Sequence, residues 1–229
     1  MTFTGHIYAE IVKTPLKVAV ASAIVVVIAV LAAVIVVQLQ RADSATTALA
    51  PAAEVLRESS HVLDDAGDEA VVVVEFLDFE CETCAALYPV VEDLREKYAD
   101  RITYAVRYFP LPGHANSATA AVAAEAAAQQ GRFEDMYHAL LSRQAEWGDV
   151  TDSQAALFRS YADELGLDMV AYDEAVASSE TLARVKQDYD DAIALGLTGT
   201  PSFFIDGKPL VLLEVDDIEN AIEKALHAR

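Results

Sequence analysis

The chain is poor in cysteine and in basic residues, and both shortages exclude some classes of function. It has only two cysteines in 229 residues, so a framework of several structural disulfides is excluded. A zinc site needs about four ligands, which two cysteines and five histidines without paired spacing do not supply. Lys and Arg number 16 against 37 Asp and Glu, and the net charge is −21. Because this charge repels phosphate backbones, no nucleic-acid partner is expected, and no metal or other cofactor is expected either.

Long apolar runs are confined to residues 18–37, where Ser22 is the only mildly polar side chain. At 1.5 Å per residue this run would make a helix of about 30 Å, enough to cross a bilayer core. It is long for a cleavable signal peptide and lacks small residues directly after it, so we expect an uncleaved transmembrane anchor. Lys13 and Lys17 favour a cytoplasmic tail at residues 1–17, which places the rest of the chain outside the cytoplasm at the cell membrane.

The residues after this span follow the pattern of an α/β domain. β-Branched runs predict strands, and apolar spacing of about 3.6 residues predicts helices. The expected strands cover residues 61–63, 70–76, 102–108, 201–205 and 209–213. The expected helices cover residues 81–98, 116–130, 133–144, 154–165, 169–178, 181–195 and 216–228. Because one helix joins the strands at 70–76 and 102–108, these should be parallel in a right-handed βαβ unit.

These elements predict one α/β domain interrupted by a block of helices. Residues 38–60, rich in Ala, Ser, Thr and Glu, are expected to link this domain to the membrane span. The first part of the domain is expected at residues 61–114, the helical insertion at 115–182 and the second part at 183–229.

The two cysteines stand three positions apart, in Cys81-Glu82-Thr83-Cys84, where a strand gives way to a helix. The first N–H groups of a helix are unpaired and its dipole is positive there, so a sulfur at that place is stabilised as a thiolate. Cys81, at the helix start, is the expected nucleophile. Cys84, one turn further on, is the expected resolving thiol. The alternative is an inert disulfide or a buried pair.

Four local features carry a resemblance to the DsbA-like thiol:disulfide oxidoreductases over about residues 60–229. They are the cysteine motif, Glu75 six residues before it, Pro89 five residues after it, and Gly199-Thr200-Pro201 at the entry to a strand. The resemblance implies a thioredoxin fold with an inserted α-helical domain. It also implies a cis peptide bond before Pro201 that faces the cysteines, so that the loop of Thr200 and Pro201 binds a client strand. A membrane partner, quinone-linked, would reoxidise the cysteines.

Glu75 lies in a run of four valines, where an ionised carboxylate would lose its hydration. Its pKa is therefore expected to be raised. Such an acid beneath the cysteines could take and return the proton of Cys84. The alternative is that Glu75 reaches solvent at the end of the strand.

Glu80 and Glu82 flank Cys81, and Glu82 and Thr83 stand between the cysteines, so all three are candidates for tuning the redox pair. Each carboxylate would raise the free energy of a nearby thiolate and oppose the helix dipole. The pKa of Cys81 is then expected in the upper part of the range of about 3.5–7.5 seen for activated cysteines, and the pair should be a mild oxidant. The alternative is that both glutamates point to solvent. His114 is expected to cap or pack, or else to lie at the rim of the site.

The sequence therefore predicts a membrane-anchored thiol:disulfide oxidoreductase that forms disulfides in exported proteins. Within the same class, a disulfide reductase or isomerase is the alternative, and its partners would again be protein thiols and disulfides. From a different class, the alternative is a non-catalytic thioredoxin-like module that binds clients.

Overall fold

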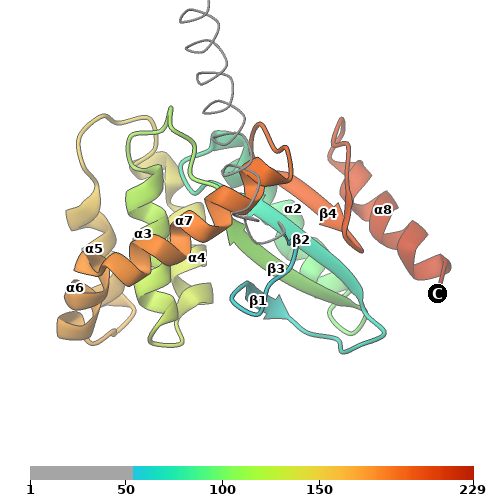
Figure 1. The fold of residues 1–229 in the computed structure, drawn as a ribbon, viewed down its shortest axis with the longest axis horizontal. Coiled ribbons are helices and arrows are strands. Elements are labelled where there is room, and N and C mark those ends of the chain that lie inside the picture. The colour runs from blue at the N-terminus through green and yellow to red at the C-terminus, as the bar shows by residue number, and fades with distance from the viewer. Residues whose placement is uncertain (1–53) are drawn as a thin grey trace, which may run out of the picture. The chain divides into compact units, whose positions relative to one another are not determined.

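A mixed sheet of five strands forms the centre of residues 54–229, the part of the chain that the computed structural model describes (Figure 1). The strand order is β1-β3-β2-β4-β5. β2 (Val71–Leu77) and β3 (Ile102–Tyr108) are the parallel pair, as expected. β1 (His61–Asp64) runs antiparallel to β3, while β4 (Ser202–Ile205) runs antiparallel to both β2 and β5 (Lys208–Pro209).

The alternation of side chains along β2 decides which residues face the cysteines. Val74 and Phe76 belong to an apolar cluster that also contains Ala192 of α7 (Ser179–Ala194). Val73 and Leu77 point the other way, into the cluster formed with α2 and α8. Glu75 shares the period of Val73 and Leu77, so its side chain lies on the α2 face of the sheet.

The helices lie on both faces of the sheet and in a block beside it (Figure 1). α2 (Glu82–Lys97) connects β2 to β3, and α8 (Asp216–His227) packs against β2 and β4. The inserted block contains α3 (Ser117–Ala128), α4 (Phe133–Ser142), the 3₁₀ turn η1 (Gln144–Glu146), α5 (Ala155–Glu164) and α6 (Met169–Ala177). α7 contacts both this block and β3, and it runs through the boundary expected between residues 182 and 183.

The strand predicted at residues 209–213 is wrong beyond Pro209. Val211 and Leu213 are 75% and 84% exposed, and neither belongs to a strand. The N–H groups of Leu213 and Glu214 instead donate to the carboxylate of Asp217, both at 2.8 Å. This pairing turns the chain into the start of α8, so the ladder with β4 ends at Pro209.

The end of the expected linker is part of the packed domain. Ser60 is buried, and the Arg57 guanidinium bonds to Asp191 of α7 at 2.5 and 2.9 Å. The expected membrane span at residues 18–37 lies outside the described residues. Within residues 54–229, every helix is too short or too polar to cross a bilayer.

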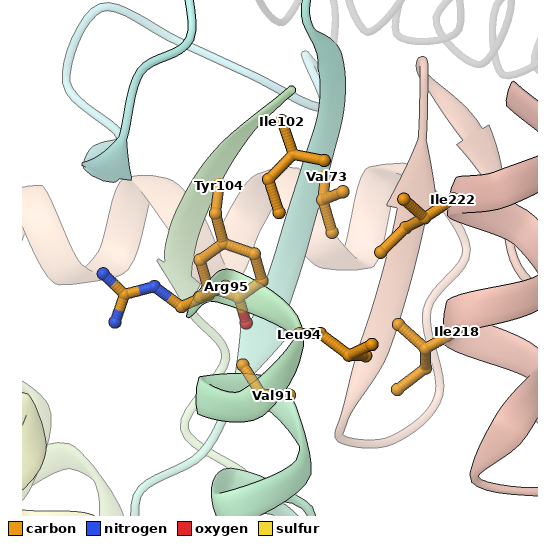
Figure 2. Close-up of a pocket in the computed structure, with 8 residues that line it drawn as sticks. All are labelled: Val73, Val91, Leu94, Arg95, Ile102, Tyr104, Ile218 and Ile222. Atoms are coloured by element: carbon orange, nitrogen blue, oxygen red, sulfur yellow. The ribbon is translucent and has the colours of Figure 1, made fainter. Parts of the chain in front are cut away.

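The core between α2, the sheet and α8 is tightly filled (Figure 2). Figure 2 shows Leu94, Ile218 and Ile222 meeting Val73, while the guanidinium of Arg95 points away from them. The space left among these side chains is about 10 Å³, at the lower limit for one water molecule. This region therefore supports the helix that carries the cysteines and does not bind a ligand.

Candidate active site

Cys81 is the N-cap residue of α2, and Cys84 lies in the first turn of that helix. The backbone of Cys81 is extended, with φ −69° and ψ 119°, and its N–H donates to the Asp78 carbonyl at 3.1 Å. Both sulfurs are free thiols, and the residues are only 8% and 2% exposed. The strand-to-helix junction thus holds one sulfur at the positive end of the helix and the other just inside it.

The surroundings of Cys81 lower the pKa of its thiol from 9.0 to about 5. The largest cause is a hydrogen bond from the Cys84 thiol, followed by burial, which acts in the opposite direction. The Thr200 hydroxyl and the backbone N–H groups of Thr83 and Cys84 also stabilise the thiolate. This value is below the upper part of the range that the acidic flanks predicted.

The Thr200 hydroxyl is positioned to stabilise the Cys81 thiolate. The protonated Cys81 thiol donates to the Thr200 carbonyl at 3.4 Å. The Thr200 hydroxyl is buried and has no hydrogen-bond partner among the described residues. Once Cys81 ionises, its sulfur becomes an acceptor for that hydroxyl, which agrees with the lowered pKa of Cys81.

The pKa of the Cys84 thiol is shifted in the opposite direction. Burial, the hydrogen bond to Cys81 and the charge of Glu75 raise the pKa of the Cys84 thiol well above 9.0. The pair therefore loses its first proton from Cys81, while Cys84 keeps its own. A nucleophile and a protonated partner are what thiol–disulfide exchange requires.

Glu75 is buried on β2, and the Tyr104 hydroxyl of β3 donates to its Oε2. Burial raises its pKa from 4.5 to about 7, the Tyr104 bond acts in the opposite direction, and the charges of Glu92 and Cys81 add to the rise. The expectation of a raised pKa is confirmed. Glu75 does not reach solvent, because only 3% of the residue is exposed.

We expect Glu75→Gln to stabilise the protein in a pH-dependent way. Because the folded pKa is about 7 against 4.5, the folded state binds more protons in this window, and stability falls as pH rises through it. Gln cannot ionise, so at pH 8 the variant should exceed the wild type by roughly 3 kcal/mol in free energy of unfolding, and the gap should close towards pH 4. Urea unfolding across this pH range measures the gap. Glu174→Gln, at an exposed position on α6, is the control and should show no such trend.

The residues predicted to tune the pair lie in three different settings. The Glu80 carboxylate is buried and accepts from the Asn116 N–H at 2.6 Å, while its carbonyl accepts from Gln144 Nε2 at 2.7 Å. Glu82 is exposed, and the neighbouring carboxylate of Asp149 raises its pKa. Thr83 is exposed too and reaches Cys81 through its backbone N–H. Their effect on the redox potential stays a prediction.

The loop before β4 brings residues distant in sequence onto the motif. The Thr200–Pro201 peptide bond is cis, which confirms the expectation. Directly after it, Ser202 pairs with Phe76 of β2, so the loop is fixed at the end of the strand that leads to the cysteines. This pairing is why Thr200 meets Cys81.

Asp78 and His114 form a pair beside the cysteines. His114 is partly exposed, as in the alternative that places it at the rim of the site, but its pairing with Asp78 was not predicted. His114 Nδ1 lies 2.6 Å from Asp78 Oδ2, and the Asp78 backbone contacts both cysteines. The available signal in the sequence was Asp78 itself, an acidic residue between the end of a strand and the cysteine motif. The partner could not be read from the sequence, because His114 is 36 positions away.

A family model described as thioredoxin matches residues 66–224. The fold is similar to that of a thioredoxin-like oxidoreductase from Silicibacter pomeroyi, with 28% identity and a TM-score of 0.63 over 76% of this chain and 95% of that one. It is also similar to oxidised BdbD from Bacillus subtilis, with 21% identity and a TM-score of 0.64 over 77% and 97% of the two chains. α-DsbA1 from Wolbachia pipientis shares the fold at 22% identity and a TM-score of 0.64, over 76% and 94%.

Among curated proteins, the chain is 38% identical over 146 residues to the Na⁺/H⁺ antiporter NhaA 1 of Mycolicibacterium gilvum. It is 40% identical over 139 residues to NhaA 3 of Salinispora tropica. These matches take in 62% and 60% of this chain but only 22% and 20% of the antiporters. The chain thus spans about a fifth of their length, and the transport named for them belongs to the whole proteins.

Proposed function

This chain belongs to the thioredoxin family, and on that basis we propose that it forms disulfides in exported proteins through Cys81 and Cys84. The observation that carries this function is the placement of the two thiols, with Cys81 at the N-cap of α2 and Cys84 buried in its first turn, which gives them opposite acidities. The pKa of Cys81 is lowered to about 5, while that of Cys84 is raised well above 9.0. Their position beside the Thr200–Pro201 loop gives the pair access to a client strand.

The reaction begins with the oxidised pair. A client thiolate attacks the Cys81 sulfur, the Cys81–Cys84 bond breaks, and Cys84 leaves with the electron pair. Glu75, with a pKa of about 7, is placed to give this sulfur a proton. A second client thiolate then attacks the client sulfur of the mixed disulfide and releases Cys81 as a thiolate. Two electrons pass from the client to the enzyme.

The low pKa of Cys81 supports oxidation as the direction of this exchange. A stabilised thiolate stabilises the reduced enzyme, and a pair with a stable reduced form is a good oxidant. A reductase or isomerase would use the same residues with less stabilisation. A non-catalytic client-binding module would not need two thiols of opposite acidity.

The cellular setting belongs to the same proposed function. Residues 18–37 would anchor the chain in the cell membrane, with residues 1–17 in the cytoplasm and the catalytic domain outside. A quinone-linked membrane partner would reoxidise the cysteines.

In intact cells, a membrane-impermeant thiol reagent followed by a mass-shift gel would report both the location of the cysteines and their redox state. A mainly disulfide population outside the cytoplasm supports the oxidase, and a mainly dithiol one supports the reductase or isomerase.

Alkylation of the reduced protein tests the catalytic part directly. With a pKa of about 5, Cys81 should react with iodoacetamide at pH 6 at least tenfold faster than a thiol in an unfolded peptide. Cys81→Ser, which keeps only the protonated Cys84, identifies the signal of Cys81 by its loss. The function fails if Cys81 reacts no faster than the peptide thiol, or if the wild-type pair cannot form a disulfide.

A further inference from the structure

Asp78 bonds both to the two cysteines and to residues outside the motif. Its carbonyl accepts from the Cys81 N–H at 3.1 Å, and its own N–H reaches the Cys84 sulfur. Its carboxylate is fully buried and accepts four hydrogen bonds, the number that an ionised carboxylate can accept. The four donors, at 2.6 to 2.9 Å, are the N–H groups of Glu80 and Leu111, the Ser117 hydroxyl and His114 Nδ1.

His114 is held by this carboxylate in one orientation. Because Nδ1 faces Asp78 Oδ2, that nitrogen carries the proton, and Nε2 is the nitrogen that titrates. The side chain is 30% exposed, so the imidazole is open to proton exchange with solvent. The buried acid and the partly open imidazole thus form a fixed pair whose outer nitrogen changes charge.

His114 is joined to Cys81 through Asp78, whose carboxylate holds the imidazole and whose carbonyl accepts from the Cys81 N–H, so the charge of His114 acts close to Cys81 and Glu82. The charged groups that act on it include the acidic groups Asp78, Glu80 and the Cys81 thiolate before and at the start of α2, and Glu82 in its first turn. Burial acts against the imidazolium, yet the bond to Asp78 and these negative charges raise the pKa of His114. The motif between the cysteines offers no cation, so this histidine supplies one from the loop between β3 and α3.

We propose that His114, oriented by Asp78, is a positioning residue whose imidazolium stabilises the Cys81 thiolate and makes the oxidising strength of the pair depend on pH. This role deepens the proposed function and rests on it. When His114 loses its proton, the thiolate loses a neighbouring positive charge, and the reduced enzyme becomes less stable relative to the disulfide. The pair should then be a stronger oxidant in mildly acidic surroundings than in alkaline ones.

The coupling must be reciprocal. If the imidazolium favours the thiolate, the thiolate favours the imidazolium by the same free energy. The pKa of His114 should therefore be higher in the reduced protein than in the disulfide form. The difference should equal the rise in the pKa of Cys81 when the cation is removed, on the order of 0.5–1 unit for charges separated by partly hydrated protein.

Two variants of His114 distinguish the effect of its charge from the effect of its hydrogen bond to Asp78. In His114→Gln the amide can still donate to Asp78 but carries no charge, whereas His114→Lys keeps a positive charge throughout the titration. Thiolate absorbance of the full-length reduced protein should show the pKa of Cys81 rising by about 0.5–1 unit in His114→Gln and staying near the wild-type value in His114→Lys. His227→Gln, at an exposed position on α8, is the matched control and should leave the curve unchanged.

The thiolate titration and the imidazole signals test the role of His114 independently. That role fails if His114→Gln titrates like the wild type, or if His114→Lys raises the pKa of Cys81 as much as His114→Gln does. It also fails if nuclear magnetic resonance finds the same pKa for His114 in the reduced and disulfide forms. A wild-type Cys81 no more acidic than a free thiol would instead overturn the proposed function itself.

Discussion

A Cys84→Ser variant is expected to accumulate client proteins bound to Cys81 and to lose turnover. Cys81 keeps its place at the start of α2, so it can still attack a client disulfide. The serine hydroxyl is not ionised near neutral pH and cannot attack the resulting mixed disulfide. We expect turnover in disulfide exchange to fall by roughly 10²-fold or more, because the step that frees the enzyme is missing. Non-reducing gels should show bands that dithiothreitol removes.

Cys81→Ser and the double variant are the controls for this trapping experiment. Cys81→Ser should lose turnover without forming adducts, because the remaining Cys84 is buried and its raised pKa keeps it protonated. The double variant Cys81→Ser/Cys84→Ser should also form none, because it has no thiol left. Adducts through Cys84 would reverse the assigned roles. The complete absence of adducts from Cys84→Ser, in cells that contain oxidised clients, would favour a module that binds without exchange.

Arg107→Met is expected to cause a large loss of stability. Arg107 is fully buried on β3, where Nε donates to Asp188 at 2.9 Å and Nη2 to Asp191 at 2.6 Å. The guanidinium also lies 5.0 Å from the ring centre of Phe76. Removing the cation leaves the carboxylate of Asp188, which is fully buried, with less compensation. We expect the free energy of unfolding to fall by about 3–5 kcal/mol.

Urea unfolding followed by fluorescence measures this loss, because Trp147 is the only tryptophan and is fully buried. Arg159→Met is the matched control. Its pair with Asp173 is half exposed, and its loss should cost less than about 1 kcal/mol. An Arg107→Met/Asp188→Leu double variant should lose less than the sum of the single losses, because the buried Asp188 carboxylate is removed together with the cation that compensates it. Equal losses for Arg107→Met and Arg159→Met would show that the buried pair has no special role.

Local patterns were sufficient to predict the parts of the site that depend on short stretches of sequence. The valine run of β2 and the apolar spacing of α2 place a strand and a helix on either side of the motif, which locates both cysteines. The same run favoured a buried Glu75 with a raised pKa, although its burial was established only by the structure. The cis bond before Pro201 was expected only through the family resemblance.

Features that depend on long-range contacts could not be predicted in this way. Glu80 is adjacent to Cys81 in sequence, yet its carboxylate bonds to Asn116, because the chain returns there after β3. Arg107 alternates with apolar residues on β3 like a solvent-facing residue, but α7 covers that face and supplies Asp188. The pairing of Asp78 with His114 likewise depends on how the loop after β3 folds back.

The helical block is not an accessory that could be trimmed away to leave a minimal redox scaffold. Asn116, Ser117 and Gln144 all belong to it or border it, and they donate to Glu80 and Asp78 just ahead of the first cysteine. A shortened chain that ran directly from β3 into α7 would keep both sulfurs and the sheet. It would lose the donors that hold the turn before Cys81, and the acceptors left behind would have to find water instead.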